Sequence, residues 1–396
     1  MRVLFVLFCL ASGLVFAEEE IRIGVIGPFT GQSSADMGES IRGGARVFAE
    51  EANQLSMILG KKIVLVEKDD EAKPAVGLER AKELIEKDKV VAVVGFANFG
   101  VLMQAAPLFQ QAKVPLIVSA SAGGDITRQL KIPPGTPNFI FRVVARDSLQ
   151  TQAMFKDLVD RHKITKIAIL HDNTPYGEGG KANALADMKQ RKLQPVAVEH
   201  FKVGETDMTA QLARARSAGA EAIALYGLAA EDAMVMRSLA KMEWTVPVVA
   251  TWTASQRSFI ELGGAAAEGV RTTVTFVGNE HGGVSLEFSR NYRRLISSRG
   301  MASGVAAAQT YDALRLLYLA LNLCHCSKSE DIQKALENID QPSRSTVITR
   351  FKNPFSPTEH EAISSNMVFM GEIRKGKIVY AYKDDEQAAM LARQGK

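Results

Sequence analysis

The sequence predicts an α/β protein built from two Rossmann-like, doubly wound lobes. Short runs of β-branched residues alternate with helical stretches, and the alternation occurs twice, over roughly residues 21–142 and again from a helix that begins near Ser148. Strands that are apolar almost throughout and alternate with helices are typical of parallel sheets covered on both faces. The length agrees, because 396 residues exceed what one core ordinarily needs.

The expected elements follow from hydrophobic periodicity. Residues 139–144 close the first series, and the segment 131–137 before them holds three prolines and a glycine that exclude regular structure there. Apolar residues three and four apart predict amphipathic helices, among them one through Ile41, Ala45, Phe48, Ala52 and Leu55 and one through Val305, Ala308, Leu314, Leu317 and Leu321. The predicted strands are 21–26, 62–67, 90–94, 114–118, 166–170, 194–199, 222–226, 246–250 and 270–275.

The first 17 residues have the layout of a secretory signal peptide. A basic residue at position 2 precedes an apolar run over 3–15, and small residues near Ala17 suit cleavage before the acidic run 18–20. The alternatives are a membrane anchor, for which the run is shorter than the roughly 20 residues required, and lipid attachment at Cys9, which lies inside the run. The pattern predicts export to the periplasm with the signal peptide removed.

Charge argues against a nucleic-acid partner. The chain has 48 lysines and arginines against 44 acidic residues, and the two kinds are interspersed, as in the stretch 79–89. Such mixing is typical of solvated helix surfaces and unlike a basic stripe that follows a phosphate backbone.

Cys324 and Cys326 flank His325 at the end of an apolar helical run. A zinc site normally needs four ligands, and no others of matching type lie nearby in the sequence. A bridge across one intervening residue is expected to be strained. We therefore expect two cysteines packed near a helix end, with a bridge or an intermolecular link as the alternatives, and neither a metal nor a cofactor.

Candidate ligand-binding residues follow the predicted strands, because open α/β sheets bind ligands beyond the carboxyl ends of their strands. Small and hydroxyl-bearing residues there let the backbone approach a ligand and orient it. Aromatic side chains (Phe29, Phe99, Tyr176 and Trp252) supply apolar walls. The segments concerned are 27–31, 95–100, 119–124, 171–177, 226–228 and 251–253.

Several motifs in order resemble those of a known family. They are the segment 23–28 with Gly31, the run 67–70, the runs 93–95 and 115–119, and His171-Asp172 with the segment 176–179. In this order and spacing the chain is similar to the periplasmic branched-chain amino-acid-binding proteins, the type I solute-binding components of ABC importers. The resemblance covers almost the whole chain after the signal peptide.

The resemblance implies a type I periplasmic-binding-protein fold with a three-segment hinge. Crossings are expected near 142–145, 271–275 and 349–351, which gives lobe one as 20–142 plus 274–350 and lobe two as 143–273 plus 351–396. Such a protein is expected to be a monomer that closes around a small-molecule ligand and presents the closed form to an ABC permease in the inner membrane. For residues 387–396 the sequence does not decide between a terminal helix on lobe two and a frayed tail.

In the family, two lobe-one loops hold the ligand carboxylate through backbone N–H groups and hydroxyls. These loops fall on Asn98, Phe99 and Gly100 and on the stretch from Ser119 through Ser121 to Gly123. The serine expected early in the first loop is Phe99, and the threonine expected at the end of the second is Gly123, so Ser121 is the candidate hydroxyl. The expected lobe-one tyrosine falls on Met37. Tyr176 matches the ligand-facing tyrosine of lobe two.

The acid that meets the ligand ammonium in the family falls here on Thr253, and a second tyrosine falls on Ala229. Glu231 or Asp232 could compensate, although acids are favoured at a helix start in any case. With Trp252 beside the site, these changes favour a small carboxylate with an apolar or aromatic body over leucine, isoleucine or valine. The alternative for Phe99 and Trp252 is an ordinary core position.

An enzyme is not expected. The segment 24–28 lacks the third glycine of a dinucleotide-binding loop, and the sequence has no phosphate-binding G-x-x-x-x-G-K-[ST] motif. His171 and Asp172 are interpreted as residues that shape a strand-end loop, with acid–base chemistry as the alternative. The remaining rival is a ligand-sensing receptor module that acts with a separate membrane partner.

Overall fold

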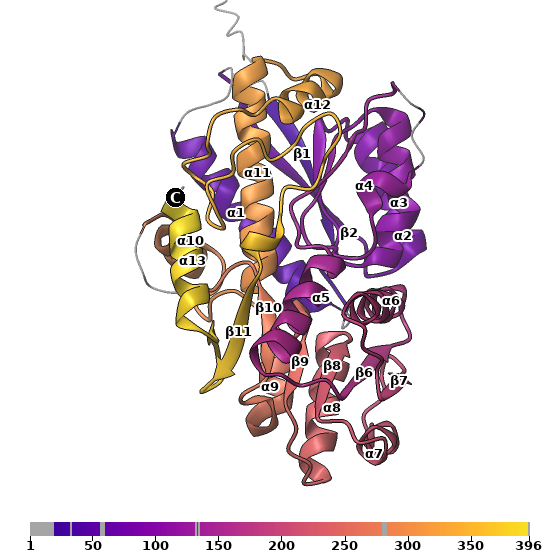
Figure 1. The fold of residues 1–396 in the computed structure, drawn as a ribbon. Coiled ribbons are helices and arrows are strands. Elements are labelled where there is room, and N and C mark those ends of the chain that lie inside the picture. Colours follow the sequence, from indigo (N-terminus) through magenta and orange to yellow (C-terminus); the bar gives the residue numbers. More distant parts are fainter. Residues whose placement is uncertain are drawn as a thin grey trace, which may run out of the picture.

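The computed structural model describes residues 20–394 apart from 32–33, 56–59, 131–132, 134 and 279–282. The predicted signal peptide lies outside the described residues. Two sheets are arranged end to end, the first in the upper half of Figure 1 and the second in the lower half. The α/β fold class predicted from the sequence is confirmed.

The first sheet is entirely parallel and has the order β2-β1-β3-β4-β5. Its central strands are buried because they are apolar almost throughout, as the sequence predicts for a sheet covered on both faces. The strands are β1 Glu20–Gly27, β2 Lys62–Asp69, β3 Ala92–Gly95, β4 Leu116–Val118 and β5 Ile140–Arg142.

The second sheet has the order β12-β11-β10-β9-β8-β6-β7. Five of its strands are parallel, and β11 and β12 add an antiparallel hairpin whose turn places Lys375 and Gly376 at positive φ. The hairpin was not predicted, because its strands are short and β12 is only partly buried. The strands are β6 Ile167–Asp172, β7 Ala197–Phe201, β8 Ala222–Tyr226, β9 Val248–Ala250, β10 Arg271–Val274, β11 Phe369–Arg374 and β12 Lys377–Tyr380.

Helices flank both sheets, with α1 and α11 packed together beside the first sheet and α2 packed on α3 (Figure 1). The α-helices are α1 Ala35–Leu55, α2 Pro74–Lys82, α3 Phe99–Ala112, α4 Ile126–Gln129, α5 Asp147–Phe155, α6 Pro175–Gln190, α7 Thr209–Ser217, α8 Ala229–Lys241, α9 Arg257–Gly263, α10 Gly283–Leu295, α11 Gly304–Cys324, α12 Ser329–Glu337 and α13 Lys383–Gln394. Short π turns (Glu83–Lys87, Lys156–Arg161) and 3₁₀ turns (Trp252–Ser255, Gly264–Ala267, Ser365–Met367) complete the set.

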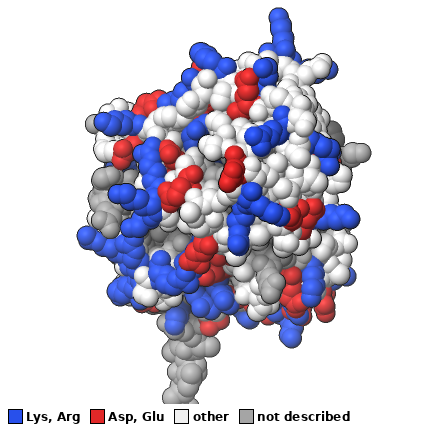
Figure 2. Space-filling model, turned by 90° about the horizontal axis from the view of Figure 1, so that it is seen from below, with Lys and Arg blue, Asp and Glu red and all other residues white. Residues whose placement is uncertain are grey.

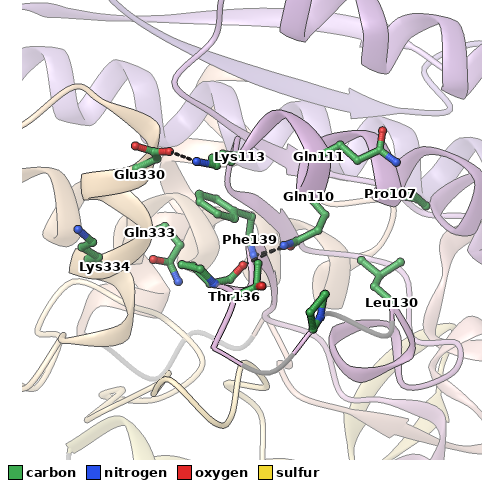
Figure 3. A pocket seen from close by; sticks show the side chains of 12 residues that line it. Pro107, Gln110, Gln111, Lys113, Leu130, Thr136, Phe139, Glu330, Gln333 and Lys334 are labelled. Atoms are coloured by element: carbon green, nitrogen blue, oxygen red, sulfur yellow. Dashed lines mark hydrogen bonds and ion pairs between the residues drawn. The ribbon is translucent and has the colours of Figure 1, made fainter.

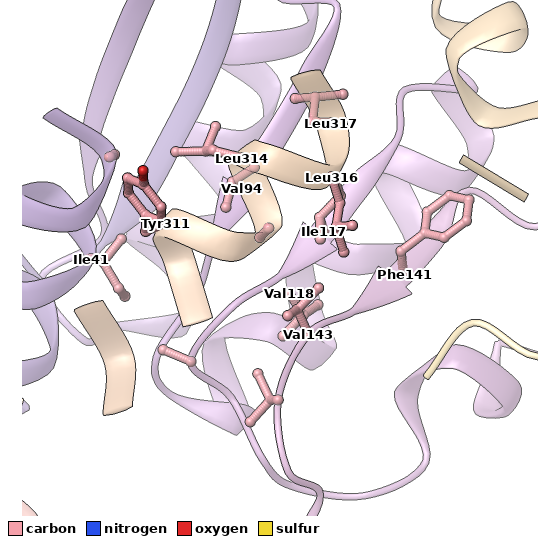
Figure 4. Close-up of a cluster of buried hydrophobic side chains, with 14 of the residues drawn as sticks. Ile41, Val94, Ile117, Val118, Phe141, Val143, Tyr311, Leu314, Leu316 and Leu317 are labelled. Atoms are coloured by element: carbon pink, nitrogen blue, oxygen red, sulfur yellow. The ribbon is translucent and has the colours of Figure 1, made fainter. Parts of the chain in front are cut away.

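Helix α11 forms much of the lobe-one core. Ser303 caps its first turn by accepting from the Ala306 N–H at 3.2 Å, and most of the helix is buried. Figure 4 shows Leu316 beside Ile117 and Leu314 close to Val94. The predicted apolar stripe therefore packs on the strands whose carboxyl ends position the candidate site.

The segment after α12 packs on lobe one before the chain returns to the second sheet. The His360 ring stacks on the Phe141 ring with centroids 3.9 Å apart, and the Phe355 ring packs edge-on against the Phe141 ring. These contacts favour a third crossing between Ile363 and Phe369, later than the predicted 349–351. The lobe boundaries remain our proposal.

The C-terminal residues form helix α13 as far as Gln394. The Ala392 carbonyl accepts from the Arg350 N–H at 3.2 Å and from the Thr349 hydroxyl at 3.0 Å. The Arg393 guanidinium lies 5.5 Å from the centre of the Phe276 ring. The sequence leaves open a terminal helix on lobe two or a frayed tail. A helix is observed, and its last turn contacts Thr349 and Arg350 of predicted lobe one.

Cys324 and Cys326 form a disulfide, which corrects the expectation of two unbridged cysteines. His325 ends α11 in a left-handed conformation with φ of 47°. This reversal brings the two Cα atoms to 5.1 Å, within the ordinary range for a disulfide. The expectation rested on the strain anticipated for a bridge across one intervening residue.

The described surface mixes charges of both signs. Figure 2 shows lysines and arginines interspersed with acidic side chains over the face seen from below. Many are paired, such as Arg214 with Glu199 at 2.6 Å. Among the described residues, no helix combines the length and apolarity that a membrane crossing requires.

Candidate functional site: a cleft between the two sheets

A cavity of about 230 Å³ lies where the carboxyl-end loops of both sheets meet. Its volume is at the small end for a ligand pocket, which indicates a small guest. Both lobes contribute to its wall. The lining residues are Ser34, Met37, Ala72, Pro74, Ala97, Asn98, Phe99, Gly100, Val101, Ala120 and Ala122 from the first half of the chain, and Thr174, Pro175, Tyr176, Val203, Leu228, Trp252 and Thr253 from the second.

Six of the ten site residues predicted from the sequence line this cavity. They come from three separate loops that the fold brings together, after β3, after β6 and after β9. The six are Asn98, Phe99, Gly100, Tyr176, Trp252 and Thr253.

The other four predicted residues are not among the lining residues. Phe29 lies beneath the Arg42 guanidinium, 5.0 Å from its ring centre, and Ser119 is fully buried with its hydroxyl 2.9 Å from that of Thr310. Ser121 and Gly123 belong to the loop that lines the cavity through Ala120 and Ala122. The Ser121 hydroxyl is buried and has no hydrogen-bond partner among the described residues.

Phe99 and Gly123, the two lobe-one departures from the family pattern, depend on each other. A Cβ atom on Gly123 would lie 2.5 Å from Cγ of Phe99, closer than such atoms approach. The glycine therefore makes room for the phenylalanine ring, which occupies the wall where the family pattern has two hydroxyls. This exchange makes the lobe-one wall more apolar.

Several lining residues were not among the candidates, notably Ala72, Pro74 and Val203, whereas Leu228 lies in the predicted segment 226–228. Each of the three follows a strand, as the predicted residues do, since β2 and β7 end just before them. Their positions shortly after predicted strands could therefore have identified them. They were missed because these side chains are apolar and carry no motif.

Two helix N-termini face each other across the cleft. Helix α3 begins at Phe99 and α6 at Pro175, and a Cβ atom on Gly100 would lie 3.9 Å from Cγ of Pro175. Both ends carry partial positive charge. The first turn of α3 has no side-chain cap, whereas in α6 Pro175 has no N–H and the Gly177 N–H donates to the Thr174 hydroxyl at 3.2 Å. An anion between them is stabilised by both helices.

The turn before α3 needs an unusual backbone. Gly95 has φ of +147°, and a Cβ atom there would lie 2.0 Å from the Ile26 carbonyl oxygen. Phe96 follows at φ of 60° and donates its N–H to the same oxygen at 2.9 Å. This tight crossing of β1 aims the start of α3 at the cavity.

Asp172 organises two loops of the lobe-two wall. Its Oδ1 accepts from the Thr174 N–H at 2.8 Å, and its Oδ2 accepts from the Leu228 N–H at 3.0 Å. Burial raises its pKa, and these hydrogen bonds oppose the rise. The interpretation of His171 and Asp172 as loop-shaping residues agrees with this arrangement.

A chain of hydroxyls lies behind the lobe-two wall. The Tyr176 hydroxyl donates to Thr251 Oγ1 at 2.8 Å, Thr251 and Thr253 Oγ1 are 3.0 Å apart, and the Thr253 hydroxyl donates to Asp232 Oδ2 at 3.1 Å. Asp232 is fully buried in the first turn of α8. Burial raises its pKa well above the usual range, and the neighbouring Asp172 adds to the rise.

Glu231 and Asp232, the two acids weighed as partners for an ammonium, serve different contacts. Glu231 accepts from the Gly204 N–H at 2.9 Å, whereas Asp232 reaches the cavity lining through Thr253. Both lie in the first turn of α8, where the helix dipole favours acids. Neither is itself a lining residue.

Asp147 is a buried acid that sequence analysis did not single out. It begins α5, its N–H donates to the Ala122 carbonyl at 3.1 Å, and neither carboxylate oxygen has a hydrogen-bond partner among the described residues. Burial raises its pKa to about 7, and Arg142 lowers it in part. Its charge also raises the pKa of Tyr176, after burial of that phenol.

Arg142 holds the lobe-one ligand loop from behind. Its guanidinium donates to the carbonyls of Ala122, Gly123 and Gly124 at 3.3, 3.0 and 2.9 Å, and its Nε donates to Glu361 at 2.8 Å. The arginine side chain is fully buried and the glutamate nearly so. These hydrogen bonds therefore hold the three loop carbonyls pointing toward Arg142.

A larger hollow on lobe one lacks these features. It measures about 640 Å³ and lies beside α3 and α12, where Figure 3 shows Lys113 and Glu330 paired at one side and Gln110 beside Phe139. It has no wall from the second sheet, so a guest there would not bridge the lobes. Among the described residues, no cluster of histidine, cysteine or acidic side chains could hold a metal ion.

Comparison with known proteins shows which families and structures resemble this architecture. A family model described as periplasmic binding protein matches residues 20–377. Leu/Ile/Val-binding protein homolog 2 of Brucella abortus is 31% identical over 268 residues, which cover 66% of this chain and 68% of that protein.

Solved structures share the fold at lower identity. A leucine binding protein from Thermotoga maritima superposes with a TM-score of 0.79 at 22% identity, over 92% of this chain and 99% of that one. A Rhodopseudomonas palustris ABC-transporter solute binding protein in complex with benzoate gives 0.75 at 18% identity, over 91% and 95%. These relatives are solute-binding proteins rather than enzymes, and the chain belongs to the periplasmic binding protein family, in its branched-chain amino-acid-binding group.

Proposed function

We propose that this protein captures a small carboxylate with an apolar or aromatic body between its two lobes and delivers it to an ABC permease. The observation that carries the proposal is the pair of helix N-termini, α3 and α6, that face each other across a cavity with aromatic walls. Two partial positive charges at close range repel each other unless an anion lies between them. A carboxylate supplies that anion, and its binding favours the closed arrangement.

The lining argues against a ligand with an α-ammonium group. None of the described lining residues is acidic or basic, and Thr253 stands where the family pattern has an acid. An ammonium buried without a carboxylate in contact costs several kcal/mol. Phe99, Trp252 and Tyr176 instead provide surfaces for a flat or branched apolar body.

Closure of the lobes is supported by contacts on the far side of the cleft from α6. The Ser258 N–H at the start of α9 donates to Asp36 Oδ2 at 2.6 Å, and Arg257 pairs with Glu39 at 3.4 Å. These contacts join helix α9 of lobe two to α1 of lobe one. They hold the two halves together with little preference for ligand chemistry, so the cavity sets the selectivity.

The cellular setting is part of the same proposal. The N-terminal sequence pattern, together with the membership of the periplasmic binding protein family, supports a periplasmic location after signal-peptide cleavage. We propose a monomer, because each lobe must move relative to the other. The branched-chain amino acids are the second candidate ligands, because the matched Brucella and Thermotoga proteins carry those names.

The test is a comparison of ligands that share a skeleton. Leucine and 4-methylpentanoate differ only in the α-ammonium, and benzoate adds an aromatic body. Isothermal titration and thermal shift should show 4-methylpentanoate or benzoate binding more tightly than leucine, with a ligand at 100 times its Kd raising stability by about 2.7 kcal/mol. Leucine binding at least tenfold more tightly than both would contradict the proposal.

A further inference from the structure

We propose that Asp232, acting through Thr253 and Thr251, makes the Tyr176 side of the cavity a hydrogen-bond acceptor, so that the bound carboxylate must carry a neutral O–H or N–H donor on its apolar body. The inference rests on the proposed function and adds a second requirement to the ligand. It assigns Asp232 as a positioning residue for selectivity, although Asp232 does not line the cavity.

The argument begins at the buried end of the chain of hydroxyls. Each threonine hydroxyl has one hydrogen. The Thr253 hydroxyl donates its hydrogen to Asp232 Oδ2, with the two oxygens 3.1 Å apart. Toward Thr251, whose Oγ1 lies 3.0 Å away, the Thr253 oxygen can therefore only accept. Either oxygen of that central pair could donate by geometry alone, and the direction follows from Asp232 Oδ2 being the acceptor. Because burial raises the pKa of Asp232, the proton of its neutral form then lies on Oδ1, which has no other partner among the described residues.

The direction then carries to the cavity wall. Because the Thr251 hydrogen points to Thr253, the Tyr176 hydroxyl must donate to Thr251, as it does at 2.8 Å. Tyr176 and Thr253 both line the cavity, and both have their hydrogens committed away from it. What these two hydroxyls can still offer a ligand is lone pairs.

The opposite side of the cavity has the reverse character. The α3 N-terminus, on lobe one, provides N–H donors suited to the carboxylate. A ligand that satisfies both sides therefore has an acceptor end and a donor end, separated by the apolar body that meets Trp252 and Phe99. A neutral donor suits the second end better than an ammonium, because its desolvation costs less.

The experiment uses matched benzoates whose substituents differ in hydrogen-bonding sense. We would titrate 3- and 4-hydroxybenzoate and their methyl ethers into the full-length mature protein by calorimetry. We expect at least one hydroxy acid to bind about 5- to 10-fold more tightly than its ether in the wild-type protein, the range of one neutral hydrogen bond. In Asp232→Asn, whose amide can donate to Thr253 and let the chain run either way, this ratio should fall to about 1–2.

Two further variants separate selectivity from folding. Thr253→Val cuts the chain and should also abolish the ratio, whereas Thr253→Ser keeps the hydroxyl and should retain it. Asp312→Asn is the matched control, since Asp312 is an equally buried acid that accepts from the Val347 and Ile348 N–H groups away from the cleft, and the ratio should survive. Thermal unfolding of each variant checks that it is folded.

The outcomes separate the two proposals. If the benzoates bind and every hydroxy acid equals or falls below its ether in the wild type, the donor requirement is wrong and the carboxylate proposal stands. If the ratio persists in Asp232→Asn and in Thr253→Val, Asp232 does not set it and the inference is overturned. If none of the four benzoates and no aliphatic carboxylate binds, the proposed function fails and takes this inference with it.

Discussion

The two walls of the cleft are built on the same plan and differ in chemistry. On lobe one, a loop and a helix start approach the cavity with backbone groups and with the ring of Phe99, for which Gly123 leaves room. On lobe two, side-chain hydroxyls approach it, and buried acids lie behind them. The comparison teaches that strand-end loops of one topology can present different chemistry to one cavity, so selectivity depends on what lies behind each loop.

The largest effect is expected from removing the lobe-two aromatic wall. Trp252 is 3% exposed and contacts the lobe-one core cluster, so Trp252→Ala should lower the free energy of unfolding by about 3–5 kcal/mol. Chemical denaturation measures this directly. Phe99→Ala, on the more open lobe-one wall, is the paired variant, and an equal or larger loss there would break the comparison.

Asp147 should make stability fall as pH rises. Its folded pKa of about 7 lies above the ordinary 3.8, so the folded state binds the extra proton, and the stabilisation present below pH 4 is lost as pH rises to 7. Asp147→Asn should remove about 2–4 kcal/mol of this decline. Asp70 and Asp312 also have raised pKa values and add slopes of their own, so the measurement is the difference between variant and wild type in denaturation at pH 5 and 8.

A smaller effect tests the coupling of Phe99 and Gly123. Gly123→Thr places a Cβ atom 2.5 Å from Cγ of the ring, and the overpacking should destabilise the protein by about 1–3 kcal/mol. Phe99→Ser in the same chain should relieve most of the clash and restore the hydroxyls of the family pattern. A double-mutant cycle in thermal unfolding checks the sign, and strict additivity would show that the two positions are independent.

The smallest effect concerns the contacts that hold the lobes together away from the ligand. Arg257→Ala removes a partly exposed pair with Glu39 and should cost under about 1 kcal/mol, less in high salt. Affinity should fall by a similar factor for every ligand. A change that favours one ligand over another would mean that this side of the cleft also selects.

Most of the fold could be predicted because strong local patterns determine it. Apolar runs such as 222–226 coincide with strands, and the stripe through Val305 and Leu321 lies on a single long helix. The hairpin at 369–380 was not predicted because its strands are short and β12, which is only partly buried, carries little hydrophobic periodicity. The bridge between Cys324 and Cys326 escaped because it depends on one left-handed residue, which the sequence does not reveal.

Site residues could be predicted where a sequence motif or a strand end marks them. Those whose role depends on buried contacts could not. Tyr176 and Thr253 were found from their place after a strand, but the hydroxyl chain that links them to Asp232 requires three-dimensional contacts. Asp147 was missed for the same reason, since a helix start gives an acid an ordinary explanation. Sequence therefore predicted six of the residues that line the cavity, while the hydrogen bonds behind its lobe-two wall are seen only in the structure.

The guanidinium of Arg142 has a consequence for the speed of capture. It fixes three successive loop carbonyls while Glu361 fixes the guanidinium, so this part of the binding surface acquires its shape when the protein folds. An incoming molecule then meets a surface that needs no ordering of its own. Encounter should be limited by diffusion and by the rocking of the lobes, with the loop itself adding no delay.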